Sequence, residues 1–128
     1  MSTDLASAYH GYIDCLNAQD WPRLGDFVSE GVEYNGNVVG LAGYLAMLER
    51  DFREIPDLRF TIALLVCDAS TVGARLAFDC TPVGRYFDLD INGRRITFTE
   101  NVFYTFSDGK IGKVWSVIDK AAIAAQLT

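Results

Sequence analysis

The sequence predicts an α+β fold in which helices pack on one face of a curved antiparallel sheet. Segments with helical periodicity come first, and segments rich in β-branched and aromatic residues follow Pro56, without the strand–helix–strand alternation of a parallel sheet. The longest strand-like stretch, residues 96–119, is divided by an Asp-Gly pair, which is typical of a hairpin turn because glycine tolerates positive φ. The chain has 128 residues, half of them hydrophobic, so we expect residues 1–128 to form a single domain.

Three amphipathic segments are predicted to be N-terminal helices. In residues 3–19 apolar side chains recur every three or four positions, with Ser2 or Thr3 as the cap. Residues 20–28 predict a shorter helix with a proline in its first turn, where the missing N–H is harmless. Residues 41–54 repeat the helical pattern, and an Ile-Pro-Asp sequence ends it.

The strands are predicted between turn signals. Residues 31–36 read as a short strand that runs into an Asn-Gly turn. Residues 58–67, residues 72–80 and the stretch from residue 86 onward read as strands of an antiparallel meander. The final hairpin turns at residues 107–110, and helix-forming residues follow it.

The last strand carries the candidate catalytic residue. Trp115, Val117 and Asp119 fall at period two and share one face, which places a carboxylate beside an indole. Asp119 also stands where the strand pattern changes to the helix-forming residues 120–127. It is therefore either a functional acid at a strand end or the N-cap of the C-terminal helix, and the sequence leaves both open.

Charge and hydropathy exclude several classes of partner. The net charge is −6, and the eleven Lys and Arg residues form no run, which argues against contact with nucleic acid or an anionic membrane surface. The N-terminus has no basic region followed by an apolar stretch, and no segment approaches the roughly 18 apolar residues of a membrane span. We expect a soluble, cytoplasmic protein without nucleic-acid or membrane partners.

The sequence has few residues that could bind a metal or form a nucleophile–histidine–acid triad. Cys15, Cys67 and Cys80 are widely spaced and odd in number, which favours reduced thiols over disulfides or a zinc site. The single histidine, His10, lies off the apolar face of its helix. We therefore expect no metal and no cofactor.

Several segments resemble the SnoaL-like polyketide cyclases of the nuclear transport factor 2-like superfamily. They are YIDCLNAQDW (12–21), IPDLRF (55–60), GRRITF (93–98) and DGKIGKVWSVID (108–119), followed by Gln-Leu near the C-terminus. The resemblance spans nearly the whole chain in matching order. It implies a cone-like α+β barrel, in which three N-terminal helices pack on a strongly curved sheet over a deep pocket, often in a homodimer.

The family resemblance also implies a reaction. Its cyclases close a ring by intramolecular aldol condensation without metal or cofactor, and an aspartate at the Trp-x-x-x-Asp spacing is the general acid/base. That position is Asp119 here, and desolvation by an indole would raise the pKa of a carboxyl toward neutrality. The sequence departs from the family at Thr105, where relatives often carry His or Arg, and at Pro82, where they often carry His.

The main hypothesis is a cofactor-independent cyclase or isomerase that acts on a small hydrophobic carbonyl compound, with Asp119 as its base. The face of residues 97, 99, 101, 103 and 105 is expected to form the polar wall of the pocket. The remaining roles are pocket shaping and oxyanion stabilisation, and the candidate residues are Trp115, Tyr12, Tyr34, Phe27, Asn101, Phe103, Thr105 and Arg75.

Two alternatives remain. One is a non-catalytic module that binds a small apolar ligand and dimerises through the opposite sheet face, which carries Glu100, Tyr104 and Phe106. The other resembles limonene epoxide hydrolases, in which an Asp-Arg-Asp set with Tyr and Asn positions water. The residues that could supply those types are Asp119, Arg75, Asp79, Tyr34 and Asn35, although the spacing differs at Ala77 and an Arg75–Asp79 surface ion pair would also explain two of them.

Overall fold

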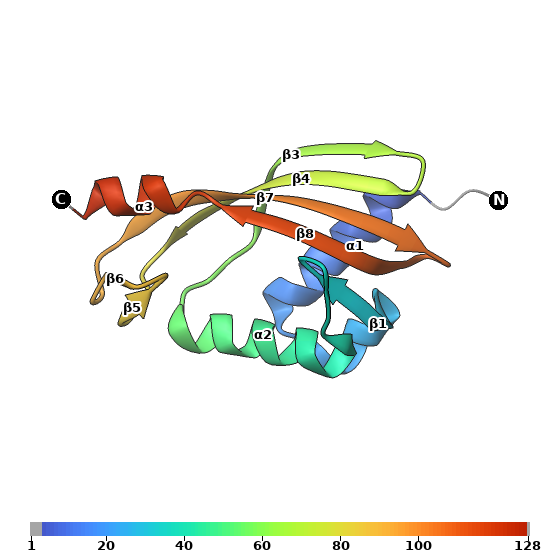
Figure 1. Cartoon of the computed structure of the whole chain (residues 1–128), viewed down its shortest axis with the longest axis horizontal. Helices are drawn as coiled ribbons and strands as arrows, with labels where there is room; N and C mark the ends of the chain where they lie inside the picture. The colour runs from blue at the N-terminus through green and yellow to red at the C-terminus, as the bar shows by residue number, and fades with distance from the viewer. Residues whose placement is uncertain (1–3, 128) are drawn as a thin grey trace.

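The computed structural model describes residues 4–127, which form a bent six-stranded sheet with α1 and α2 below one face (Figure 1). The helices are α1 (Leu5–Ala18), the 3₁₀ helix η1 (Trp21–Asp26), α2 (Gly40–Glu54) and α3 (Lys120–Gln126). The strands are β1 (Val28–Tyr34), β2 (Asn37–Val38), β3 (Thr61–Asp68), β4 (Thr71–Cys80), β5 (Arg85–Tyr86), β6 (Leu89–Asp90), β7 (Ile96–Ser107) and β8 (Lys110–Ile118). The predicted α+β class and the helices-first order are confirmed.

The three predicted N-terminal helices are present, with one change of type. α1 begins after Asp4, whose side chain accepts the Ser7 N–H at 3.3 Å, while the predicted caps Ser2 and Thr3 lie outside the described residues. η1 is a 3₁₀ helix that carries the proline in its first turn. A 3₁₀ helix is common in such short connecting pieces.

The sheet has the strand order β2-β1-β8-β7-β4-β3. Its pairs are antiparallel except β1 with β8, which run parallel. The β7–β8 turn uses Asp108 and Gly109, both at positive φ, as predicted for an Asp-Gly hairpin. The strand predicted to begin at residue 86 is interrupted at once, because Phe87 and Asp88 adopt positive φ and turn the chain into the separate β5–β6 hairpin.

The two faces of the sheet differ in what covers them. On the inner face, toward α1 and α2, β7 contributes Phe98, Val102, Tyr104 and Phe106 to the hydrophobic core. The outer face carries the alternate residues, including Phe103 at 56% and Trp115 at 43% exposure. Tyr9, Tyr12, Ile13 and Leu16 of α1 pack against the inner face, because α1 presents its apolar stripe there.

This arrangement corrects the predicted pocket wall. Thr97, Asn101 and Phe103 belong to the exposed outer face, whereas Tyr104 and Phe106, expected outside, are buried beneath the sheet. Side chains alternate along a strand, so assigning the wrong phase transfers every residue to the opposite face. The helices cover the alternate set because it is the larger continuous apolar surface.

No helix within residues 4–127 is long and apolar enough to span a membrane.

Candidate functional site

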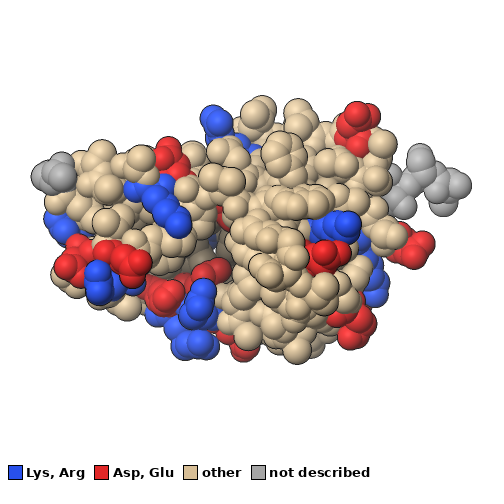
Figure 2. Space-filling view, viewed as in Figure 1, with Lys and Arg blue, Asp and Glu red and all other residues tan. Residues whose placement is uncertain are grey.

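A cavity of about 480 Å³ opens between α2, the inner face of the sheet and the β5–β6 hairpin. Figure 2 shows acidic and basic side chains around the hollow beside this hairpin. Six aromatic side chains line the walls, together with four acids and two arginines. The lining residues are Tyr34, Met47, Arg50, Asp51, Glu54, Leu58, Phe60, Phe78, Arg85, Tyr86, Phe87, Asp88, Phe98, Glu100 and Ile118.

Glu100 is the polar residue of β7 that enters the cavity. It lies in phase with Phe98 and Val102, so its side chain points toward the helices rather than to solvent. The Ser116 hydroxyl on the neighbouring β8 strand donates a hydrogen bond to Oε2 of Glu100. Burial raises the pKa of the Glu100 carboxyl, and the Ser116 hydrogen bond opposes that rise only in part. Glu100 is therefore a positioned and poorly solvated carboxyl in the cavity wall.

Asp51 approaches the same cavity from α2, on the opposite side. Desolvation raises its pKa to about 7, and the negative charge of Glu100 adds to the rise while Arg50 opposes it. Within residues 4–127 no basic side chain forms an ion pair with Asp51 or Glu100, since Arg50 lies 3.9 Å from Glu54 instead. The cavity thus holds two carboxyls that share a site, and neither forms an ion pair within the described residues.

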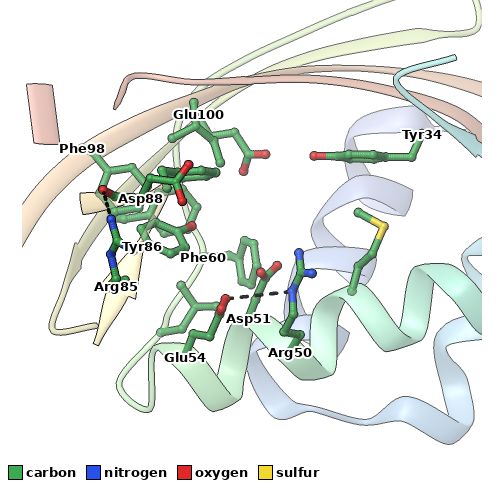
Figure 3. A pocket seen from close by; sticks show the side chains of 15 residues that line it. Tyr34, Arg50, Asp51, Glu54, Phe60, Arg85, Tyr86, Asp88, Phe98 and Glu100 are labelled. Atoms are coloured by element: carbon green, nitrogen blue, oxygen red, sulfur yellow. Dashed lines mark hydrogen bonds and ion pairs between the residues drawn. The ribbon is translucent and has the colours of Figure 1, made fainter. Parts of the chain in front are cut away.

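Tyr34 ends β1 and faces Glu100 in the close-up view (Figure 3). Its ring meets that of Tyr44 edge-on, with centroids 6.4 Å apart. Burial raises the pKa of the Tyr34 hydroxyl, and an interaction with the Ser116 side chain opposes that rise only in part, so this group stays protonated at neutral pH.

The β5–β6 hairpin forms one side of the cavity mouth. Arg85 lies 3.0 Å from Asp90 in an ion pair and donates to the Asp88 carbonyl oxygen at 2.8 Å. The Lys120 ammonium sits 4.7 Å from the centre of the Phe87 ring, which joins the hairpin to the start of α3. Because these contacts involve exposed charges, they hold the hairpin only weakly.

An inner chamber of about 60 Å³ continues the cavity toward α1. It shares Tyr34, Met47, Asp51, Phe60 and Glu100 with the larger cavity. Three tyrosines line its far part, Tyr12, Tyr44 and Tyr104, with only 2%, 5% and 3% of their surfaces exposed. Glu100 therefore stands where a wide aromatic cavity meets a small phenol-lined chamber.

Asp119 lies outside this cavity. Asp119 is exposed, and its carboxylate caps α3 by accepting a hydrogen bond from the Ala122 N–H at 3.1 Å. It borders a separate hollow of about 630 Å³ on the outer side, together with Asp79, Thr97 and Gln126. The helix-cap alternative is confirmed, and the expected enclosure of Asp119 beside the indole is wrong because Trp115 faces outward.

The cap gives a direct prediction. Asp119→Ala should lower the free energy of unfolding by about 1 kcal/mol, because the first turn of α3 loses a side-chain acceptor. Asp119→Asn keeps an oxygen at that place and should remain within about 0.5 kcal/mol of the parent protein. Urea unfolding monitored by circular dichroism measures both; equal losses in the two variants would argue against capping as the role of Asp119.

The other predicted site residues divide between the two sides of the sheet. Tyr12 lines the inner chamber and Tyr34 lines both cavities, as the pocket hypothesis requires. Phe27 is absent from both linings; its ring lies 3.0 Å from the position of a Cβ on Gly11 and packs against the core. The outer face holds the remainder, namely Arg75, Asn101, Phe103, Thr105 and Trp115.

The residues of the epoxide-hydrolase alternative do not come together in one site. Arg75 donates to Asn101 on the outer face at 2.9 Å, and the expected Arg75–Asp79 ion pair is wrong because Arg95 binds both oxygens of Asp79. The Asn35 side chain pairs with the backbone of Ser116. Tyr34 faces the inner cavity, so the sheet separates it from Arg75 and Asp79.

Glu100 and Asp51 are the site residues that sequence reasoning missed. Residues 96, 98, 102, 104 and 106 are apolar or aromatic at period two, and Glu100 is the one charge among them. A charge within an otherwise apolar strand face indicates either a functional site or that the face has been wrongly assigned to the core. No comparable signal marks Asp51, which sits in a helix with several other charged residues.

Residues 6–127 match the family model of the SnoaL-like polyketide cyclases, which is almost the entire chain. The chain belongs to this family. The crystal structure of a SnoaL-like polyketide cyclase from Agrobacterium tumefaciens is 52% identical in sequence to this chain. The two superpose with a TM-score of 0.97, and the match covers 100% of each chain.

More distant structures share the fold alone. Wild-type IdmH from Streptomyces antibioticus has 18% identity and a TM-score of 0.84, covering 98% of this chain and 99% of its own. A nuclear transport factor 2-like protein of unknown function from Burkholderia pseudomallei has 14% identity and a TM-score of 0.78, covering 99% of each chain. The chain therefore has the predicted cone-like α+β fold, which these structures share. No curated protein matches it significantly.

Proposed function

We propose that this SnoaL-like protein is a cofactor-independent acid/base enzyme of the cyclase or isomerase type, acting on a small hydrophobic carbonyl compound. The observation that carries the proposal is the carboxyl of Glu100, which is partly buried in the wall of an aromatic and charged cavity and forms no ion pair within residues 4–127. A carboxylate that is poorly solvated is a stronger base than one in water, which proton abstraction beside a carbonyl requires.

In this proposal Glu100 removes the proton. A C–H bond next to the substrate carbonyl breaks, an O–H bond forms on Glu100, and the electron pair moves onto the carbonyl oxygen to give an enolate. The Ser116 hydroxyl holds Oε2 of Glu100, which leaves Oε1 to face the substrate. The proton neutralises the carboxylate as the enolate charge appears, so the total charge in the poorly solvated cavity stays constant.

Asp51 serves as the second acid in the same proposal. Its pKa of about 7 keeps a substantial fraction protonated at neutral pH, so it can return a proton to the substrate or to a newly formed alkoxide. The two carboxyls influence one another, so their titrations belong to the pair. Activity should accordingly rise as Glu100 ionises and fall as Asp51 loses its proton.

The walls indicate the type of substrate. A volume of about 480 Å³ lies within the range of small-molecule pockets. Phe60, Phe78 and Phe98 offer flat apolar surfaces against which ring systems stack. A compound with fused rings and a ring carbonyl fits these features, and the family's cyclase activity agrees with it.

The proposal is tested with β-tetralone, a hydrophobic ketone that carries acidic protons beside its carbonyl. The protein is incubated with it in deuterated buffer, and proton NMR follows the replacement of those protons by deuterium. We expect the protein to accelerate the exchange well above the buffer rate, in proportion to protein concentration. Exchange no faster than with an equal concentration of serum albumin would overturn the proposal.

The expectation of a homodimer is supported by the outer face of the sheet. Five large apolar side chains are exposed there or at its edge: Leu64, Val66, Phe103, Trp115 and Val117. The register places Val66, Gly73, Phe103 and Trp115 in one row across four strands, and Gly73 leaves room for the Phe103 ring. A contiguous apolar patch of this kind is typical of an association surface, which also suits the alternative of a ligand-binding module that dimerises.

We predict that the protein is a dimer in solution and that Phe103→Lys combined with Trp115→Lys converts it to a monomer, because two buried charges would oppose association. Val83→Lys changes an equally exposed apolar residue in a loop away from the sheet and should leave the dimer intact. Sedimentation velocity distinguishes the species. A monomeric parent protein, or a dimer unaffected by the double change, would contradict this assignment.

A further inference from the structure

Tyr9, Tyr12, Tyr44 and Tyr104 form a cluster at the inner chamber, and their hydroxyls have more protons to donate than the cluster uses. Tyr9 donates its hydroxyl proton to the Tyr104 oxygen at 3.0 Å, and the hydroxyls of Tyr12 and Tyr44 lie 2.7 Å apart. Each hydroxyl has one proton to donate. Within residues 4–127 the Tyr104 hydroxyl donates to no group, and the Tyr12–Tyr44 pair uses one of its two protons. Two donors therefore remain.

Both remaining donors belong to residues that line the inner chamber. Tyr104, Tyr12 and Tyr44 border it, whereas Tyr9 lies behind them and does not. The rings are packed against one another, with centroids of Tyr9 and Tyr104 4.9 Å apart and those of Tyr12 and Tyr104 5.9 Å apart. The hydrogen bond from Tyr9 uses the Tyr104 oxygen as an acceptor and leaves the Tyr104 proton available for another partner. Burial also raises the pKa of these hydroxyls, so they stay protonated.

We propose that the inner chamber is an oxygen-binding subsite, in which Tyr104 and the Tyr12–Tyr44 pair each donate one hydrogen bond to a carbonyl, enol or phenol oxygen of the ligand. The chamber is about 60 Å³, enough for one such group and too small for a ring system. The ligand therefore enters with its oxygen leading, and its apolar rings remain in the larger cavity beside Phe60 and Phe98.

This inference rests on the proposed function and deepens it. Glu100 lines both the chamber and the larger cavity, so a carbon next to an oxygen held in the chamber lies beside the Glu100 carboxyl. As the C–H electron pair moves to the oxygen, the hydrogen bonds from the tyrosines strengthen, because charge develops at the atom they contact. The favoured substrate class is a hydrophobic ring compound whose carbonyl is at one end.

The probe is β-naphthol, the aromatic analogue of the enol of β-tetralone, and naphthalene is the matched compound without oxygen. Isothermal titration calorimetry measures both against the parent protein, Tyr104→Phe and Tyr9→Phe. Tyr9→Phe is the matched control, since it removes a hydroxyl from the same cluster but outside the chamber. Thermal unfolding of each variant verifies the fold.

We expect Tyr104→Phe to weaken β-naphthol binding about tenfold and to leave naphthalene binding unchanged, because only the oxygen loses a donor. Tyr9→Phe should change either affinity by less than about threefold. The double change Tyr12→Phe with Tyr44→Phe should weaken β-naphthol binding to a similar extent. It provides an independent test if Tyr104→Phe fails to fold. Equal affinities of the parent protein for β-naphthol and naphthalene would overturn the subsite. So would an unchanged preference for β-naphthol in both Tyr104→Phe and the Tyr12→Phe/Tyr44→Phe double variant.

The two proposals fail separately. Tyrosine-dependent β-naphthol binding without deuterium exchange into β-tetralone would retain the subsite and reject the acid/base enzyme. Exchange catalysed equally by the parent protein and Tyr104→Phe would retain the enzyme and reject the subsite.

Discussion

Replacing Glu100 by glutamine is expected to reduce the rate of deuterium exchange into β-tetralone by about 10³-fold. The amide has nearly the same shape and can still accept the Ser116 hydrogen bond, but it cannot take up a proton. The free energy of unfolding should not fall, because the variant no longer holds a poorly solvated carboxyl. Proton NMR of the ketone measures the rate, and urea unfolding measures the stability.

Two control variants make this result specific. Glu49→Gln makes the same change on an exposed part of α2 and should keep the full rate. Asp119→Asn tests the base expected from the family motif, and we expect it to retain most of the rate because Asp119 caps α3 outside the cavity. If Asp119→Asn abolishes exchange while Glu100→Gln retains it, the family aspartate is the base and Glu100 is not.

Asp51→Asn is expected to make the protein more stable at about pH 8 and to have little effect at about pH 4. In the native state the Asp51 pKa is about 7, above the value of an unfolded chain. As the pH rises from about 4 to about 7, the unfolded state loses this proton first and the native state keeps it, so the parent protein loses stability over that interval. Above the native pKa the loss is complete.

The size of this effect is about 1–2 kcal/mol, after reducing the full pKa difference for the partial exposure of Asp51. The asparagine variant avoids the loss because it carries no titrating group. Urea unfolding of both proteins at the two pH values gives the difference. Asp14→Asn removes a carboxyl from an exposed position of α1 and is the matched control. An unchanged stability of Asp51→Asn at about pH 8 would mean that Asp51 is well solvated.

Helix positions and turns could be predicted because local signals determine them. The periodicity of residues 41–54 and the Asp108-Gly109 turn both correspond to observed elements. The break at Phe87 and Asp88 could not be predicted in the same way, since Phe rarely adopts positive φ and Asp88 is not followed by the glycine that marks the Asp108-Gly109 turn.

The candidate site was predicted less well, because the sheet has two partly apolar faces. Trp115 and Phe103 suggested a pocket wall, yet Phe98, Tyr104 and Phe106 on the alternate face are the residues that the helices cover. Periodicity identifies which residues share a face but does not say which face is inside when both carry aromatic side chains. Only tertiary packing makes that choice, and with it Glu100 moves from the expected outer surface into the cavity.

The most direct test of the central claim is a pH titration of the carboxyl carbons of Asp51 and Glu100 by ¹³C NMR, assigned from the spectra of Asp51→Asn and Glu100→Gln. The claim predicts that Asp51 titrates at about pH 7 and Glu100 above the ordinary glutamate value, with each titration altered when the other carboxyl is removed. Two independent titrations near pH 4, as in exposed carboxyls, would contradict it.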